Sequence, residues 1–245
     1  MPVPAAPPGG LTVEQRDAVG RSEFFRDLLP DVLDELVPAM EVSRLAPGAA
    51  LFRSGHVGHR LWVVLEGRVG VTTSRRDRLL AVMEAGDVIG EVQVFDPAPW
   101  AFGATAMGRA VVASAARDDV LTWVGRHTEV SAHLLQRMAR QLAVRSRAGQ
   151  EPPAADAGAR VAREVLALAD RYTVDGVVRH ALTQQQLADI VGLSRERLNK
   201  VLGELCDRRW IVVGRGHLTV LDRDALEAHA HHLPAGALVH TRGTA

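Results

Sequence analysis

One long segment free of helix breakers divides this sequence into two parts with different patterns. Residues 128–147 contain neither glycine nor proline, and their apolar residues fall on one stripe, which predicts a single amphipathic helix. The stripe consists of Val130, Leu134 or Leu135, Met138 and Leu142. Because β-branched runs precede this helix and helical patterns follow it, the chain fits neither an all-helical nor an all-strand protein. We expect an α+β fold with two compact domains.

The apolar stripe of this helix is narrow, closer to a coiled-coil seam than to a face that covers a broad core. A second copy of the helix would bury such a seam, so we expect a homodimer. The alternative is that the stripe packs on the chain's own N-terminal domain.

The part before the long helix has the pattern of a compact antiparallel β-structure. Prolines and glycines crowd residues 1–10, so we expect a flexible arm over residues 1–20. Apolar residues recur at helical spacing between 22 and 40, which predicts two short helices. From 42 to 124 short β-branched runs alternate with glycines, which predicts a β-barrel or β-roll.

The part after the long helix has the spacing of a helix-turn-helix. Residues 182–210 read LTQQQLADIVGLSRERLNKVLGELCDRRW. Thr183 is placed to cap the first helix, Gly192 to supply the positive φ of a tight turn, and Ser194 to cap the second helix. Residues 210–221 then alternate around two glycines, as in the hairpin that forms the wing of a winged helix.

The second helix of this pair carries the side chains that suit DNA. Leucine and valine occupy one face of it, so the opposite, polar face is predicted to be exposed and to enter the major groove. Arginine can donate two hydrogen bonds to guanine, and a carboxylate can accept one from cytosine, so Glu196 among arginines favours sequence reading. The alternative is a solvated helix face held by salt bridges. The candidate DNA-binding residues are Thr183, Gln185, Ser194, Arg195, Glu196, Arg197, Asn199, Lys200 and Arg215.

These motifs resemble the cyclic-AMP receptor protein (CRP/FNR) family of transcription regulators, most of all its actinobacterial cyclic-AMP-responsive members. LTQQQLADIVGLSRERLNKVLGEL is similar to the family's helix-turn-helix, and AGDVIGEVQVFDPAP to its phosphate-binding cassette. The resemblance implies a homodimer on a palindromic operator in double-stranded DNA, with RNA polymerase as a further candidate partner. The domains it implies are a flexible arm (1–20), a cyclic-nucleotide-binding-like β-roll (21–126), a dimerisation helix (127–147), a hinge (148–158), a winged helix-turn-helix (159–228) and a tail (229–245).

The cassette departs from the family's pattern where the cyclic phosphate binds. By resemblance Trp100 and Ala101 stand where cyclic-AMP binders have an arginine followed by serine or threonine, and no arginine lies between Glu91 and Gly108. Loss of one partner of a buried charge pair costs about 2–5 kcal/mol, so we do not expect tight cyclic-AMP binding. The family's adenine-contacting pair is also changed. The candidate effector-pocket residues are Gly90, Glu91, Val92, Trp100, Ala101, Arg145 and Ser146.

Three interpretations of this pocket stay open. In the first, Trp100 and Phe102 fill it and the regulator needs no ligand. In the second, the rings stack on another planar effector such as cyclic di-GMP, with Arg145 or Arg60 taking its charge. In the third, a weak affinity for cyclic AMP persists. No cofactor other than such a cyclic nucleotide or cyclic dinucleotide is implied. Two rival functions are a nucleotide-sensing adaptor without DNA specificity and a ligand-free architectural DNA binder.

Composition and missing motifs argue against several other classes. The 29 Lys and Arg residues balance 29 Asp and Glu, so any DNA contact must be local. A lone Cys206 allows neither a disulfide framework nor a four-cysteine zinc site. His56 and His59 lie three apart and are interpreted as surface residues rather than haem or metal ligands. We find no catalytic motif and no apolar run that could span a membrane, so we expect a cytoplasmic protein that is not an enzyme.

Overall fold

The computed structural model describes residues 10–22, 24–73, 78–149, 157–174, 177–178, 182–214 and 217–230, with the backbone alone for 140–149 and 174. The chain divides into two compact units, one ending at Leu142 and one beginning at Ala143. The helices and strands of the N-terminal unit are α1 (Val13–Arg21), α2 (Pro30–Asp34), η1 (Val37–Ala39), β1 (Met40–Leu45), β2 (Ala50–Phe52), β3 (Arg60–Glu66), β4 (Arg68–Thr73), β5 (Leu79–Glu84), β6 (Val88–Ile89), α3 (Glu91–Phe95), β7 (Phe102–Ala106), β8 (Ala110–Ala116), α4 (Arg117–Arg126) and the first turns of α5 (Thr128–Gly149).

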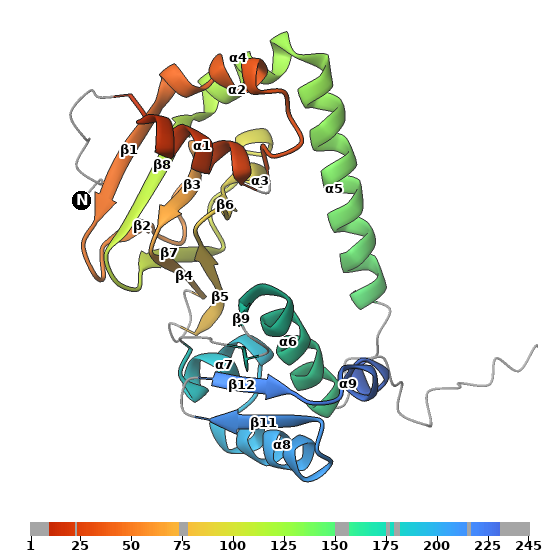
Figure 1. Ribbon diagram of the computed structural model, residues 1–245. Coiled ribbons are helices and arrows are strands. Elements are labelled where there is room, and N and C mark those ends of the chain that lie inside the picture. The colour runs from red at the N-terminus through yellow and green to blue at the C-terminus, as the bar shows by residue number, and fades with distance from the viewer. Residues whose placement is uncertain are drawn as a thin grey trace, which may run out of the picture. The chain divides into compact units, whose positions relative to one another are not determined.

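Two four-stranded antiparallel sheets form the β-roll of the N-terminal unit, in the orders β1-β8-β3-β6 and β2-β7-β4-β5 (Figure 1). Strand β3 is buried on both faces, because its successive side chains point to opposite sides of the sheet and a core lies on each side. Leu61 and Val63 join a core with the helices, whereas Trp62 and Val64 join a core between the two sheets. The predicted β-roll is therefore observed, with two cores rather than one.

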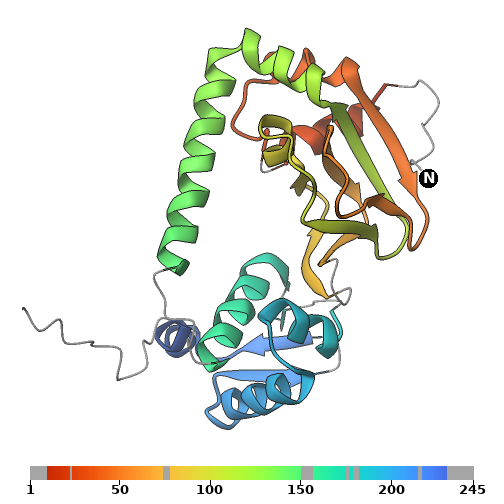
Figure 2. The ribbon, with the colours of Figure 1, turned by 180° about the vertical axis from the view of Figure 1, so that it is seen from behind.

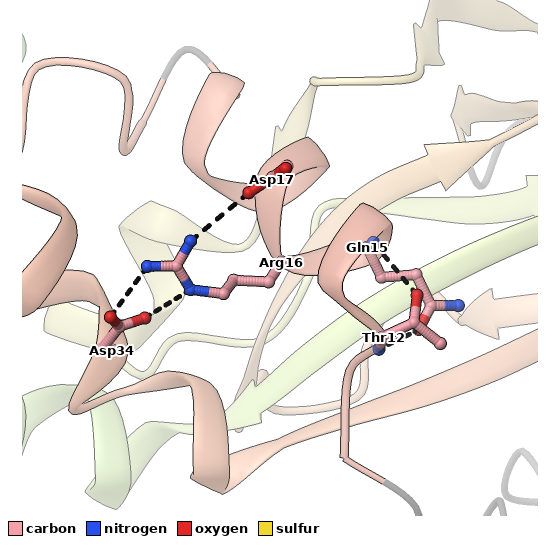
Figure 3. Close-up of polar contacts among 5 residues, drawn as sticks. All are labelled: Thr12, Gln15, Arg16, Asp17 and Asp34. Carbon is pink, nitrogen blue, oxygen red and sulfur yellow. Dashed lines mark hydrogen bonds and ion pairs between the residues drawn. The ribbon is translucent and has the colours of Figure 1, made fainter.

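The prediction of a flexible arm over residues 1–20 is wrong for its second half, because Val13–Arg21 form helix α1. Thr12 caps α1 through a reciprocal hydrogen-bond pair with Gln15, and Arg16 makes a two-pronged ion pair with Asp34 of α2, with Nη2 2.8 Å from Oδ2 (Figure 3). The arginine lowers the pKa of the Asp34 carboxyl from its ordinary value. Val19 is buried in the helix-side core. The expectation failed because the prolines end at Pro8, and residues 1–9 lie outside the described part.

Two further predictions for the N-terminal unit need correction. Residues 117–126 form α4, although the β-pattern was expected to continue to residue 124. Acidic residues in the first turn of α4 and Arg126 in its last turn suit the helix dipole, and Trp123 anchors the helix by donating its indole N–H to the carbonyl of Val32 at 2.7 Å. Of the two short helices expected between 22 and 40, only α2 is an α-helix, and η1 is a 3₁₀ turn.

His127 is the single residue between α4 and α5. Its Nε2 lies 3.1 Å from Oε2 of Glu35, and its Nδ1 lies 3.2 Å from Oε1 of Glu129. The contact with Glu35, followed by that with Glu129, raises the pKa of the imidazole above its ordinary value. The start of the long helix is thus held to the segment after α2 by a titratable contact.

The C-terminal unit packs helices against a small sheet. Strand order is β11-β12-β10-β9, and one apolar core joins α6, α7 and α8 to the sheet and to Leu226 of the last helix. The predicted helix, helix pair and hairpin are all observed, and the hinge expected over 148–158 lies largely outside the described residues. The elements are α6 (Ala157–Tyr172), β9 (Thr173–Val174), β10 (Val177–Val178), α7 (Gln184–Val191), α8 (Arg195–Asp207), β11 (Ile211–Gly214), β12 (His217–Val220) and α9 (Arg223–Ala230).

Candidate functional site

The turn between α7 and α8 has the geometry expected of a helix-turn-helix. The Thr183 hydroxyl accepts a hydrogen bond from the Gln186 N–H, and the Thr183 N–H donates one to Oε1 of Gln186. Gly192 ends α7 with a φ of 81°, a left-handed conformation that favours glycine. Ser194 then caps α8 by accepting from the Arg197 N–H. The chain direction between the two helices is therefore fixed by local chemistry at both ends of the turn.

Helix α8 has one buried face and one exposed face, as predicted. Leu198 is 0% exposed in the C-terminal core, and three more apolar side chains share its face: Val201, Leu202 and Leu205. Five polar side chains are exposed: Arg195, Glu196, Arg197, Asn199 and Lys200. Among the residues that the structure describes, these five side chains form no hydrogen bond or ion pair with one another. This face is exposed to solvent, as both interpretations require, and its described residues lack the salt bridges that the alternative includes.

The remaining predicted DNA contacts have mixed positions. Thr183 and Ser194 are exposed, but in this structure their hydroxyl groups serve as helix caps. Gln185 is exposed and donates from Nε2 to Oδ1 of Asp189 at 2.9 Å. Arg215 lies outside the described residues, between β11 and β12.

The helix of the cassette, α3, is preceded by Gly90, which no larger residue can replace. Gly90 has a φ of 100° and caps α3, and a Cβ there would lie 2.5 Å from the Arg60 carbonyl oxygen. Glu91 is half-buried at the start of α3, and Val92 is exposed. Packing against the Arg60 backbone therefore requires glycine at this turn, and the first helical side chains after it differ in exposure.

Trp100, which stands where the resemblance leads us to expect an arginine, is buried among other aromatic side chains. It is 2% exposed and stacks on Phe52 with ring centroids 3.9 Å apart. Trp62 and Phe102 complete the cluster at 6.1 and 5.3 Å, and Trp62 also lies beside Gly90. The next residue, Ala101, is exposed. Four aromatic side chains therefore pack together around this position.

Sequence reasoning did not single out Phe52 or Trp62 for this cluster. A signal existed, because each follows a leucine in a short strand and so points to the opposite face of its sheet. Arg60, a candidate for an effector's charge, donates to Oε2 of Glu41 at 2.8 Å and to Oγ of Ser114 at 3.0 Å. Side chains of the other two pocket candidates, Arg145 and Ser146, lie outside the described part of α5.

Comparison with known proteins identifies both units. Residues 42–127 match the cyclic nucleotide-binding domain, and residues 159–229 match the Crp-like helix-turn-helix domain. A CRP-like cAMP-activated global transcriptional regulator of Mycobacterium tuberculosis is 30% identical over 221 residues, covering 87% of this chain and 99% of that relative. The chain belongs to the CRP-like family of transcription regulators.

Other relatives agree with this assignment. The cyclic AMP receptor protein of Thermus thermophilus is 26% identical over 217 residues, covering 86% of this CRP-like chain and 98% of the relative. The solved structure of FixK2 from Bradyrhizobium japonicum has a TM-score of 0.68 at 18% identity, covering 79% of this chain and 98% of FixK2. The solved structure of a CooA variant from Carboxydothermus hydrogenoformans has a TM-score of 0.67 at 18% identity, covering 90% of this chain and 97% of CooA. At that identity the two structures support the fold alone.

The apolar stripe on α5 of this CRP-like regulator is divided between two environments. Val130 is 0% and Leu134 4% exposed, and both belong to the helix-side core of their own chain. Leu135 is 69% exposed and Met138 half-buried, and the part of α5 that belongs to the N-terminal unit leads away from the β-roll strands in both views (Figures 1 and 2). The prediction that Val130 and Leu134 lie at a subunit interface is therefore wrong, because their own chain already covers them. The Leu142 side chain lies outside the described part.

Neither His56 nor His59 belongs to a group of described side chains that could hold a metal ion. His56 and His59 are exposed on the loop between β2 and β3. Within the described residues, no three His, Cys, Asp or Glu side chains form a group that could hold a metal ion.

None of the described helices combines the length and the apolarity that a membrane span needs.

Proposed function

We propose that this CRP-like regulator is a homodimeric, cytoplasmic, sequence-specific DNA-binding protein that acts without tight binding of cyclic AMP. The observation that carries the proposal is the exposed polar face of α8, whose guanidinium, carboxylate and ammonium groups make no contact with one another in the described structure. Side chains in this condition are available to a partner without first breaking internal ion pairs.

The chemistry of this face favours base reading over simple phosphate binding. Arg195 and Lys200 can donate to guanine O6 and N7, and Glu196 can accept from cytosine N4. A carboxylate beside DNA phosphates is repelled, so Glu196 weakens non-specific binding while it favours one base. The capped start of α8 adds backbone N–H groups and the positive end of the helix dipole close to the DNA backbone.

A dimer is supported by the exposed apolar surface that remains on α5. With Val130 and Leu134 buried in their own chain, Leu135 and Met138 are the residues that a second α5 would cover. A large leucine side chain that is left exposed on a helix is costly in water unless another surface covers it. Two-fold symmetry would place two α8 helices on half-sites about 34 Å apart.

Independence from cyclic AMP is supported by Trp100. A buried indole offers a phosphate no positive charge, and its stack with Phe52 leaves the Trp100 ring only 2% exposed. The missing charge corresponds to a loss of about 2–5 kcal/mol, or roughly thirty-fold to several-thousand-fold in affinity. We expect saturating cyclic AMP to leave both the melting temperature and the DNA affinity unchanged, because a ligand stabilises only in proportion to its occupancy.

The direct test selects a duplex from a random pool and then measures its affinity against random DNA over a series of salt concentrations. The proposal predicts that the selected duplex binds at least about a thousand-fold more tightly than random DNA at physiological salt. Arg195→Ala should lose about five- to 150-fold on the selected duplex, and Glu196→Ala should relax the preference at one base pair.

Glu204→Ala is the matched control, because Glu204 is an exposed carboxylate on the same helix, about two turns from Glu196 and one turn beyond Lys200. It should leave both affinity and preference unchanged. A protein with no preference between the selected and random duplexes would instead be an architectural binder, and one without measurable DNA affinity an adaptor. Either result would overturn the proposal.

A further inference from the structure

A hollow of the N-terminal unit lies between the β2–β3 segment and Trp100. It has a volume of about 610 Å³ and is lined by the end of β2, the following loop and the start of β3. Its aromatic wall is formed by Phe52, Trp62 and Trp100, and none of the residues of α3 lines it. The volume falls within the range of about 300–1,000 Å³ that is usual for small-molecule sites.

Every ionisable side chain that the structure places in the lining of this pocket is basic. Arg53, His56 and His59 are exposed, and in the described part of the chain none of these three side chains forms a hydrogen bond or ion pair. Arg60 lies deeper and is already paired with Glu41 and Ser114. The rim of the pocket therefore presents one exposed guanidinium and two exposed imidazoles, whereas the deeper Arg60 is already paired with a carboxylate.

The loop that carries these groups is fixed to the segment containing Trp100. The Trp100 N–H donates to the His56 carbonyl at 2.9 Å, and the Gly55 N–H donates to the Trp100 carbonyl at 2.8 Å. A Cβ on Gly58 would lie 2.7 Å from Gln93 and 3.0 Å from Trp100, so the loop packs directly over this part of the cassette. Such a wall is preformed, which lowers the entropy cost of binding.

We propose that this pocket binds a small aromatic carboxylate, with its ring against the partly exposed Phe52 and its carboxylate on Arg53. A planar ring matches the aromatic wall, and a guanidinium can hold a carboxylate through two parallel hydrogen bonds. The assignment does not rest on the proposed DNA-binding function, because it concerns the N-terminal unit and is tested without DNA.

The test is isothermal titration of the full chain with 2-naphthoate, with 2-naphthamide as a neutral ligand of similar shape, and with inorganic phosphate. The proposal predicts saturable naphthoate binding that is at least about tenfold tighter than naphthamide binding. Arg53→Gln should weaken naphthoate binding about tenfold or more. Arg44→Gln is the matched control, since Arg44 is also exposed in this unit but does not line the pocket, and it should change nothing.

Three outcomes would overturn the assignment. Absence of saturable naphthoate binding would show that the pocket does not accept this class of ligand. An equal loss in Arg53→Gln and Arg44→Gln would show only general attraction to a basic chain. Phosphate displacing naphthoate at similar concentration would show that the ring contributes nothing. Because Arg53 is exposed, its variant should fold, and an unchanged melting temperature checks this.

Discussion

Replacing Trp100 by alanine tests the filled cassette most sharply. The change removes a ring that is 2% exposed and stacked on Phe52 with centroids 3.9 Å apart. Truncation of a buried tryptophan costs about 3–5 kcal/mol. We expect the upper part of that range, because Trp62 and Phe102 also contact this ring and each aromatic pair adds about 0.5–1.5 kcal/mol beyond burial. For a unit of this size the loss corresponds to a fall in Tm of about 8–20 °C.

The assay is differential scanning calorimetry of the full chain, in which the unfolding transition of the N-terminal unit should move. Trp100→Phe keeps a stacking ring and should lose less than half as much. Trp210→Ala is a control of the same chemical size in the C-terminal unit, where Trp210 is half-buried, and it should shift the other transition. A fall of less than about 3 °C for Trp100→Ala, equivalent to about 1 kcal/mol, would refute the reasoning that this ring is part of a packed core.

Three further predictions concern the two units separately. Gly192→Ala should destabilise the C-terminal unit by about 1–2 kcal/mol in urea unfolding, because Gly192 has a φ of 81°. Gly203→Ala is the control, since Gly203 lies on an open helical surface, and it should stabilise the unit by up to about 1 kcal/mol. Equal effects of the two substitutions would contradict the argument that alanine is strained at position 192. His127 has its pKa raised by Glu35 above the ordinary 6.5, so its stabilising contribution is complete below that pH and is lost as the pH rises through the higher folded value. His127→Gln should therefore be less stable than the parent chain at about pH 5.5 and closer to it at about pH 8.5, and a gap that widened with pH would be the wrong sign. Burial raises the pKa of the Glu164 carboxyl, because the charged carboxylate is less well solvated in the folded protein than in the unfolded chain. Glu164→Gln removes this charge and should therefore raise the thermal stability at pH 7. An unchanged Tm would count against this prediction.

Local patterns in the sequence were sufficient to predict the α7–α8 pair. Its caps, its left-handed glycine and the spacing of its leucines act over a few residues, so Thr183, Gly192 and Leu198 could be assigned without knowing what they pack against. The same kind of signal was overlooked at Thr12 and Gln15, whose capping box precedes α1.

Features that depend on distant contacts were harder to predict. An amphipathic stripe shows that something covers it but not which surface does, so Val130 and Leu134 were expected at a subunit interface and lie in their own core. The partner of Trp100 is Phe52, from a strand far earlier in the chain. Sequence placed the tryptophan in the cassette but could not choose between an open ring and a stacked one.

The central claim is that the polar face of α8 reads DNA, and Lys200 allows a direct measurement because it is the only lysine in the sequence. Its rate of acetylation by an amine-specific reagent can be followed by mass spectrometry, with free lysine in the same tube as a reference. The account predicts that a saturating selected duplex slows acetylation of Lys200 strongly, and that random duplex at the same concentration and physiological salt slows it little. Acetylation of Lys200 at the same rate in the fully bound complex as in the free protein would contradict the account.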